Sequence, residues 1–132
     1  MKLVNLQNPI NWNNPLNKGL VAWYLTIPEI SKGVRIHDLA GKNHGTCTNM
    51  AFSSTSGPGP TIRTGGMGEW RFDGTDDYIS MGDVLDFERT QSFTIVAWHK
   101  MSATSPSVVN RIVSKQNWFT PFSGYSLMVR GT

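Results

Sequence analysis

Acidic residues gather in one short run of the sequence. Residues 70–83, WRFDGTDDYISMGD, hold four of the nine acidic residues, and Asp76 and Asp77 are adjacent. Clustered carboxylates can bind a hard cation such as Ca²⁺, or act as the acid and base of a glycosidase. Asp is also a turn residue, because its side chain accepts hydrogen bonds from nearby backbone N–H groups. The run therefore has a chemical and a structural interpretation.

Calcium is the first chemical hypothesis. The oxygen donors that the sequence offers for it are Asp38, Asn43, Asp73, Asp76 and Asp77. The competing interpretation is that Asp38 and Asp73 hold glycine turns by bonding to the backbone. Asp73-Gly74 also predicts a hairpin between two apolar alternations, since Asp-Gly fits a tight turn between paired strands. We interpret the run first as a turn and keep calcium as a second hypothesis.

Glycoside hydrolysis would need two carboxylates that flank one sugar bond. The nearest pattern is Asp83, Asp86 and Glu88 in GDVLDFE. Asp83 and Asp86 are three positions apart, which would put them on opposite faces of a strand. We favour an exposed turn, with one helical turn over residues 84–90, and expect no enzyme activity.

Zinc and a cysteine nucleophile are weaker alternatives. His37, His44 and Cys47 fit no compact zinc spacing, and the sequence offers no evident fourth ligand. Cys47 is the only cysteine, so no intrachain disulfide can form, and adjacency along a strand does not orient a base toward it. We expect His37 to lie at the surface or the rim of a sheet.

Carbohydrate contact needs an aromatic platform with fixed polar groups beside it. Asn117, Trp118 and Phe119 lie in the loop-like stretch QNWFTPFSG, and we predict them as the carbohydrate-binding residues. Trp23 and Trp98 fit the core better. The alternative for Trp118 is that it covers an open face of a sheet.

Composition limits the class of protein. A chain of 132 residues is enough for one domain, and its net charge of +3 comes from scattered Lys and Arg. Scattered basic residues do not predict nucleic-acid binding, and no apolar stretch reaches transmembrane length. The N-terminus also lacks the apolar core of a signal peptide. We expect no membrane association, and a chain made in the cytoplasm or carried on a virion.

The elements that would position these residues are short strands. Residues 1–18 predict an extended arm, residues 53–68 a long loop, and residues 19–132 a single domain. Strand patterns occupy 19–25, 34–41, 43–50, 69–74, 77–82, 92–100, 110–116 and 124–131. Such spacing, without a helical pattern of useful length, predicts an all-β fold built as an antiparallel sandwich or barrel.

The order of motifs resembles a known superfamily. GLVAWYL, VRIHDLAGKNHGT, WRFDGTDDYISMGD, SFTIVAWHK, RIVSKQ and GYSLMVRG together, over residues 19–132, resemble the laminin G-like, concanavalin A-like lectin/glucanase superfamily. The opening NWNNPLNKGLVAWYL is similar to its phage-associated members. The resemblance implies an antiparallel jelly roll of two sheets, of which this sequence holds the motifs of the first half. A half-sandwich would expose apolar faces, so we expect a homo-oligomer that completes the fold.

The resemblance also implies a function. We expect a non-catalytic carbohydrate-binding or adhesion module, carried on a phage or virion, with glycan as its partner and calcium as the one cofactor to test. The alternative is a structural assembly unit without a small ligand, which associates through exposed sandwich faces. A relic of a glucanase is the third interpretation.

Overall fold

The protein has an all-β fold with antiparallel sheets, and the residues that the structure describes form almost no helix. The computed structural model describes residues 10–26, 34–50, 59–62, 68–101, 109–117, 119, 121 and 123–130. The chain divides into two compact units, unit 1 (residues 1–85) and unit 2 (residues 86–132), and this boundary lies inside the expected domain of residues 19–132. No helix in these described ranges is long and apolar enough to cross a bilayer.

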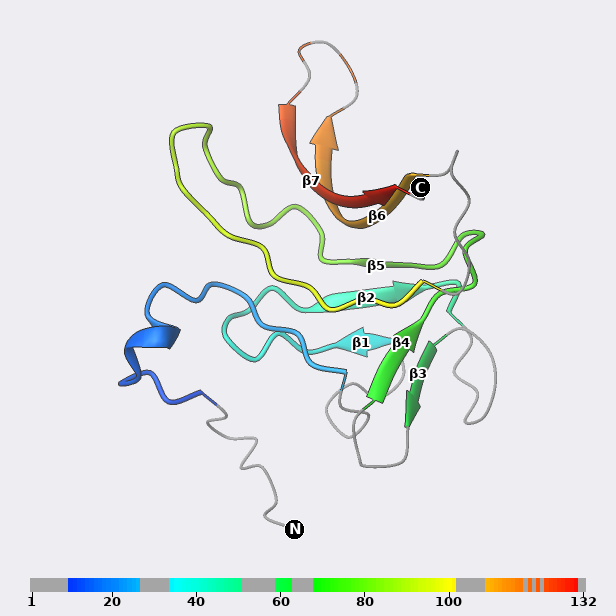
Figure 1. The fold of residues 1–132 in the computed structure, drawn as a ribbon, viewed down its shortest axis with the longest axis horizontal. Coiled ribbons are helices and arrows are strands. Elements are labelled where there is room, and N and C mark those ends of the chain that lie inside the picture. The colour runs from blue at the N-terminus through cyan, green and yellow to red at the C-terminus, as the bar shows by residue number, and fades with distance from the viewer. Residues whose placement is uncertain are drawn as a thin grey trace. The chain divides into compact units, whose positions relative to one another are not determined.

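Unit 1 contains a three-stranded antiparallel sheet in the order β1-β2-β5 (Figure 1). Its strands are β1 (Arg35–Ile36), β2 (Gly45–Thr48) and β5 (Tyr78–Ser80). Burial alternates along β2, since successive residues face opposite sides: Gly45 and Cys47 are buried and Thr46 is exposed. Cys47 lies opposite Ile79. A Cβ at Gly45 would lie 2.6 Å from Ile79 Cγ2, so glycine gives Ile79 its place on the sheet.

A second antiparallel pair in unit 1 joins β3 (Gly59–Ile62) to β4 (Gly68–Arg71). β3 lies inside residues 53–68, where the sequence predicts a loop, and that prediction is wrong for these four residues. Gly, Ser, Thr and Pro favour turns only as a local tendency. Backbone pairing with β4 outweighs that tendency here.

The turn after β4 does not form the predicted hairpin. β4 pairs with β3, whereas β5 pairs with β2, so Asp73-Gly74 connects strands of two different sheets. Gly74 has φ +82°, as a tight turn requires, and the turn itself is present. Phe72, which shares the alternation of Trp70 two residues earlier, is half exposed. The Asp-Gly sequence thus predicts where the chain turns, but it does not determine which strand β4 or β5 pairs with.

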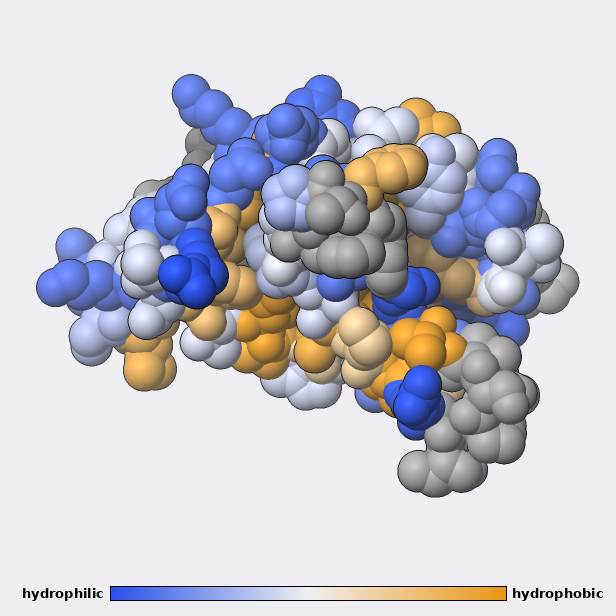
Figure 2. All heavy atoms as spheres, turned by 90° about the horizontal axis from the view of Figure 1, so that it is seen from above, coloured by the Kyte–Doolittle hydropathy of each residue, from blue (hydrophilic) through white to orange (hydrophobic). Residues whose placement is uncertain are grey.

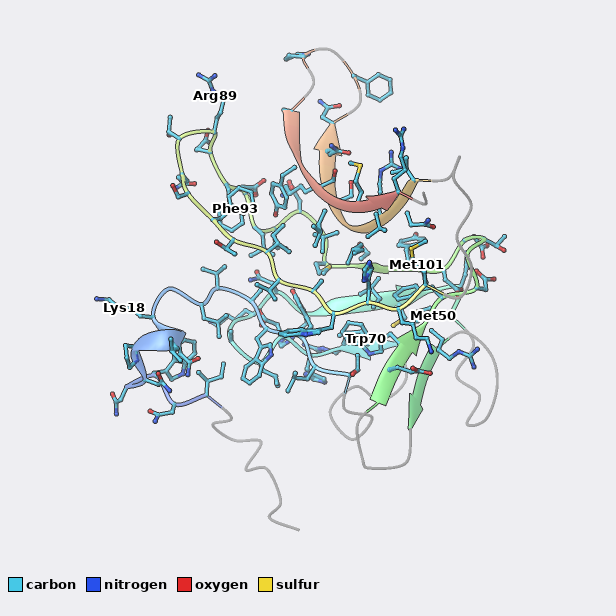
Figure 3. All side chains as sticks on the ribbon, in the orientation of Figure 1. Lys18, Met50, Trp70, Arg89, Phe93 and Met101 are labelled. Carbon is cyan, nitrogen blue, oxygen red and sulfur yellow. The ribbon has the colours of Figure 1, made fainter. Side chains whose placement is uncertain are left out.

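Among the described residues of unit 1, a few apolar side chains form a core. Ile36, Cys47 and Met50 are buried, and three partly buried side chains pack against them: Tyr24, Trp70 and Ile79. Figure 3 labels Met50 and Trp70 of this cluster. Ile36 is fully buried, which contributes about 2 kcal/mol of hydrophobic stabilisation.

The start of the described chain is held by asparagine side chains. A 3₁₀ helix, η1 (Pro15–Asn17), follows Asn14, whose Oδ1 accepts a hydrogen bond from Leu16 N at 3.0 Å. Asn11 makes the same kind of contact with Asn13 N. Ile10 is buried, so an apolar residue anchors this otherwise exposed stretch.

Unit 2 is dominated by one long antiparallel hairpin of β6 (Val109–Asn117) and β7 (Ser123–Arg130). The strands predicted at 110–116 and 124–131 are thus confirmed. The register shifts between Arg111 and Val113, which marks a bulge. Gly124 has φ +105°, and a Cβ there would lie 2.0 Å from the carbonyl oxygen of Lys115, so only glycine fits at this position.

Unit 2 is held by surface contacts beside this hairpin. Phe87 and Phe93 stack at 4.5 Å, and Tyr125 on β7 lies 4.8 Å from Phe93, measured between ring centroids. Lys115 Nζ pairs with Asp86 Oδ1 at 2.6 Å. No described residue of 86–132 is buried.

Two segments with strand patterns form no strand. Residues 19–25 contribute one isolated bridge, Tyr24 with Asp38, and residues 92–100 contribute none. Both strand predictions are wrong. The sequence pattern of a segment can suit a strand, but a strand forms only where a neighbouring backbone pairs with it. Trp98, predicted in the core, is 93% exposed. Figure 2 shows hydrophobic side chains reaching the surface among polar ones.

Candidate functional site

Three carboxylates of the acidic run meet in the turn between β4 and β5. One oxygen from each of Asp73, Asp76 and Asp77 lies within 4.8 Å of the others, and we call this group the acidic turn. Asp73 and Asp76 are exposed and Asp77 is half-buried. Five residues are predicted as calcium donors, and three of them lie in the acidic run. The structure brings the carboxylates of these three residues together.

Hydrogen bonds give the acidic turn a structural role. Asp73 N donates to Asp77 Oδ2, and Thr75 N donates to Asp73 Oδ1, each at 2.7 Å. Asn49 Nδ2 donates to Asp76 Oδ2 at 2.7 Å. The predicted turn role of Asp73 is confirmed, because its side chain holds the backbone two residues further on.

The second oxygen of Asp77 lies in a buried environment, and the charge of Asp77 acts on Cys47. Asp77 Oδ1 is buried and has no hydrogen-bond partner among the described residues. Burial raises the pKa of the Cys47 thiol, and the negative charge of Asp77 raises it further. A negative charge therefore lies beside the core with one oxygen unsatisfied.

The acidic turn fits a hard cation in the type of its donors. Carboxylate oxygens are the ligands that Ca²⁺ prefers, and a cation would reduce the repulsion among three close negative charges. Ca²⁺ takes six to eight oxygens, so three carboxylates would need backbone oxygens or water to complete the shell.

Asp38 organises a different part of unit 1. Its carboxylate accepts hydrogen bonds from Trp23 N at 2.8 Å, Ala40 N at 3.0 Å and Asn43 N at 3.2 Å. Asp38 is buried, and Gly41 passes close to its carboxylate. The predicted role of Asp38 in holding a glycine turn is confirmed.

Asn43 belongs to the same loop. Its Nδ2 donates to the carbonyl of Val21 at 3.4 Å, and its own carbonyl accepts the Tyr24 hydroxyl. Asp38 is not among the carboxylates that meet at the acidic turn. Asp38 and Asn43 thus tie residues 21–24 to the loop after β1.

The two histidines of this loop are in contact but do not suit a metal. Their rings lie edge to face with centroids 5.3 Å apart, and His44 Nδ1 accepts the backbone N–H of Asp38. A neutral histidine that accepts at Nδ1 carries its proton on Nε2, which leaves His44 no free lone pair for zinc. Burial, His44 and Arg35 lower the pKa of His37, which is half-buried.

The carbohydrate-binding prediction falls at the end of β6. Phe119 is 81% exposed, and its backbone N donates to Asn117 Oδ1 at 3.0 Å. Trp118 lies outside the described residues. The structure therefore links Asn117, the last residue of β6, through its side chain to the backbone of Phe119, whose ring is exposed.

The three acidic residues considered for glycoside hydrolysis are divided between the two units. Asp86 pairs with Lys115, and the backbone N of Glu88 donates to the side chain of Gln91 at 2.8 Å. Residues 84–90 form no helix, and a turn closes between Glu88 and Gln91. Asp83 lies in unit 1, whereas Asp86 and Glu88 lie in unit 2.

Asn49 is the contributor that sequence reasoning missed. It has φ 61°, a left-handed conformation that asparagine tolerates better than most residues. That conformation and its bond to Asp76 link the end of β2 to the acidic turn. An asparagine near the end of the strand predicted at 43–50 is the signal that could have indicated it.

Comparison with protein-family models found no match, and neither did comparison with curated proteins or with solved structures.

Proposed function

We propose that the protein is a non-catalytic binding module of the lectin-like class, part of an antiparallel jelly-roll sandwich, and that it binds carbohydrate on a phage or virion surface. The observation that carries this proposal is Phe119, 81% exposed in the connection between β6 and β7, with its backbone N bonded to the side chain of Asn117 at the end of β6. An exposed ring can stack on the apolar face of a sugar, while an amide offers hydrogen bonds to its hydroxyls.

The β6–β7 hairpin supports this role because it gives the ring a fixed base. Pairing continues to Asn117 and Ser123, at the very ends of the two strands. Gly124 allows the close approach that this pairing needs. A connection fixed at both ends by paired strands loses less conformational entropy on binding than one with free ends.

Calcium at the acidic turn is the cofactor part of this proposal. Asp73, Asp76 and Asp77 would supply the carboxylates, and Ca²⁺ would supply charge neutralisation that orders the turn. The test is a calcium titration followed by amide signals of residues 73–77, with Asp77→Asn as the variant. Unchanged signals in the unaltered protein at millimolar calcium would contradict this part.

The carbohydrate test is binding to a glycan array and to immobilised sugars, with and without calcium. Phe119→Ala should weaken binding about tenfold, the loss of about 1.4 kcal/mol of aromatic contact. Phe72→Ala is the matched control, since Phe72 is also exposed but lies in unit 1. Absence of binding at millimolar sugar with calcium present would overturn the proposal.

Assembly is the second candidate function, and a separate observation favours it. Val96 is 69% and Trp98 93% exposed in a segment that forms no strand. Large apolar side chains in this state favour association, because burying each one contributes on the order of 2 kcal/mol. Sedimentation equilibrium at micromolar concentration should give a mass above that of one chain. A single-chain mass throughout would contradict it.

A further inference from the structure

The 92–100 segment, SFTIVAWHK, has the sequence of a strand but pairs with no strand in the described part of the chain. Its backbone makes no hydrogen bond with any described residue. Exposed backbone N–H and C=O groups of an extended segment are a template for pairing with another chain. The segment combines this free backbone with exposed apolar side chains.

One end of the 92–100 segment is fixed. Phe93, labelled in Figure 3, stacks on Phe87 and lies against Tyr125 of β7. Ile95, two residues on, is half-buried, so one side of the segment is partly covered. Val96 and Trp98 alternate with these residues and are 69% and 93% exposed, and Phe93 is itself 41% exposed. The segment is thus anchored at Phe93 with its other face open.

We propose that the 92–100 segment pairs with the same segment of a second copy, antiparallel and with the two-fold axis at Val96. This inference rests on the assembly function proposed above and names its partner and register. The pairing would supply the backbone hydrogen bonds that the segment lacks. It would also be closed, since an isologous two-fold contact uses the same surface on both copies.

The side chains of the segment are compatible with this register. Antiparallel pairing about Val96 keeps residues of one face together, so Thr94 would lie opposite Trp98 and Phe93 opposite His99. The segment contains no acidic residue, and its one lysine, Lys100, would lie opposite Ser92. No like charges face each other, which would otherwise oppose the pair.

The size of the contact predicts its strength. Two Trp98 side chains would remove at most about 400 Å² from water, about a quarter of a standard interface of roughly 1,600 Å². The remainder must come from Val96, its neighbours and the paired backbone. A contact of this size predicts a reversible dimer, whose population rises with chain concentration.

Disulfide trapping in the full chain tests the register. Val96→Cys places two thiols directly opposite across the axis, about 5 Å apart between Cβ atoms. Ser92→Cys is the matched control, because its two copies would lie about 27 Å apart. Under mild oxidation we expect covalent dimers of Val96→Cys to form about a hundredfold faster than those of Ser92→Cys. Native Cys47 is buried, and the unaltered chain gives the background.

A mixture of Ser92→Cys and Lys100→Cys chains supplies the positive check. The proposed register puts these two positions opposite, so the mixture should give heterodimers. Equal trapping rates for Val96→Cys and Ser92→Cys would overturn the proposal. If the unaltered chain nevertheless sediments as an oligomer, the assembly function stands and only this register fails. If it sediments as one chain, both fail.

Discussion

Unit 1 and unit 2 are stabilised in different ways. Unit 1 has short strands but a buried core, and the Asp38 carboxylate inside it holds three backbone N–H groups. Unit 2 has the longer strands, β6 and β7, yet none of its described residues is buried. Strand length is therefore a poor guide to burial in this protein.

The difference shows where each unit is vulnerable. In unit 1 a few buried contacts carry the structure, so a single substitution there has a large effect. In unit 2 the stabilisation is spread over a ladder of backbone hydrogen bonds and a few exposed side-chain contacts, so most single substitutions there should have small effects. Three substitutions and a change of pH test this difference between the two units.

Asp38→Ala should have the largest effect. It removes the acceptor of three backbone N–H groups in a buried site, and we expect a loss of about 3 kcal/mol in the free energy of unfolding of unit 1. Urea unfolding followed by amide signals of residues 10–85 measures it. Asp38→Asn keeps Oδ1, which serves two of the three donors, and should lose less. An equal loss for both variants would contradict this account.

Gly124→Ala should destabilise unit 2 by about 2 kcal/mol, through the clash with the Lys115 carbonyl and the left-handed φ. Gly74→Ala is the matched control, with a similar positive φ but open space around it, and should cost unit 1 about 1 kcal/mol. Hydrogen exchange of β6 and β7 amides reports the first. Unchanged protection of those amides would show that the hairpin tolerates a side chain there.

Asp86→Asn should change the stability of unit 2 by no more than about 1 kcal/mol. The pair with Lys115 is short, but the Asp86 side chain is 69% exposed, so water and salt screen it. The effect should vanish in 1 M NaCl. A larger loss that persists in salt would mean that the pair is shielded from solvent.

The smallest effect should come from pH. The folded protein lowers the pKa of His37 below its ordinary 6.5, so a proton binds the unfolded chain more readily. The stability of unit 1 should hold above pH 6.5 and fall as pH drops below it. His37→Gln should remove this component of the slope, whereas His99→Gln, in unit 2, should leave it. A slope that survives His37→Gln would assign it to another group.

Much of the secondary structure follows from local sequence. The hairpin strands are predicted from alternation, and the turn role of Asp38 and Asp73 from the way Asp bonds to its own backbone. Both depend only on residues a few positions apart. The three carboxylates of the acidic turn are close for the same reason.

Which strands pair with each other does not follow from local sequence. Asp73-Gly74 predicts a turn correctly and a hairpin wrongly, since β4 and β5 each pair elsewhere. Trp98 belongs to the strand pattern at 92–100 and is still exposed. Asn49, too, reaches Asp76 across 27 positions. These outcomes depend on distant segments, which periodicity cannot identify.

Cys47 can serve as a chemical probe of local opening in unit 1. It is the only thiol, it is buried, and burial and Asp77 both raise its pKa, so a labelling reagent should meet a reactive thiolate only when unit 1 opens. The labelling rate of the unaltered protein should therefore count openings of unit 1 alone. Asp38→Ala should speed labelling, and Gly124→Ala should not. One sulfur atom would then report how far the two units fluctuate independently.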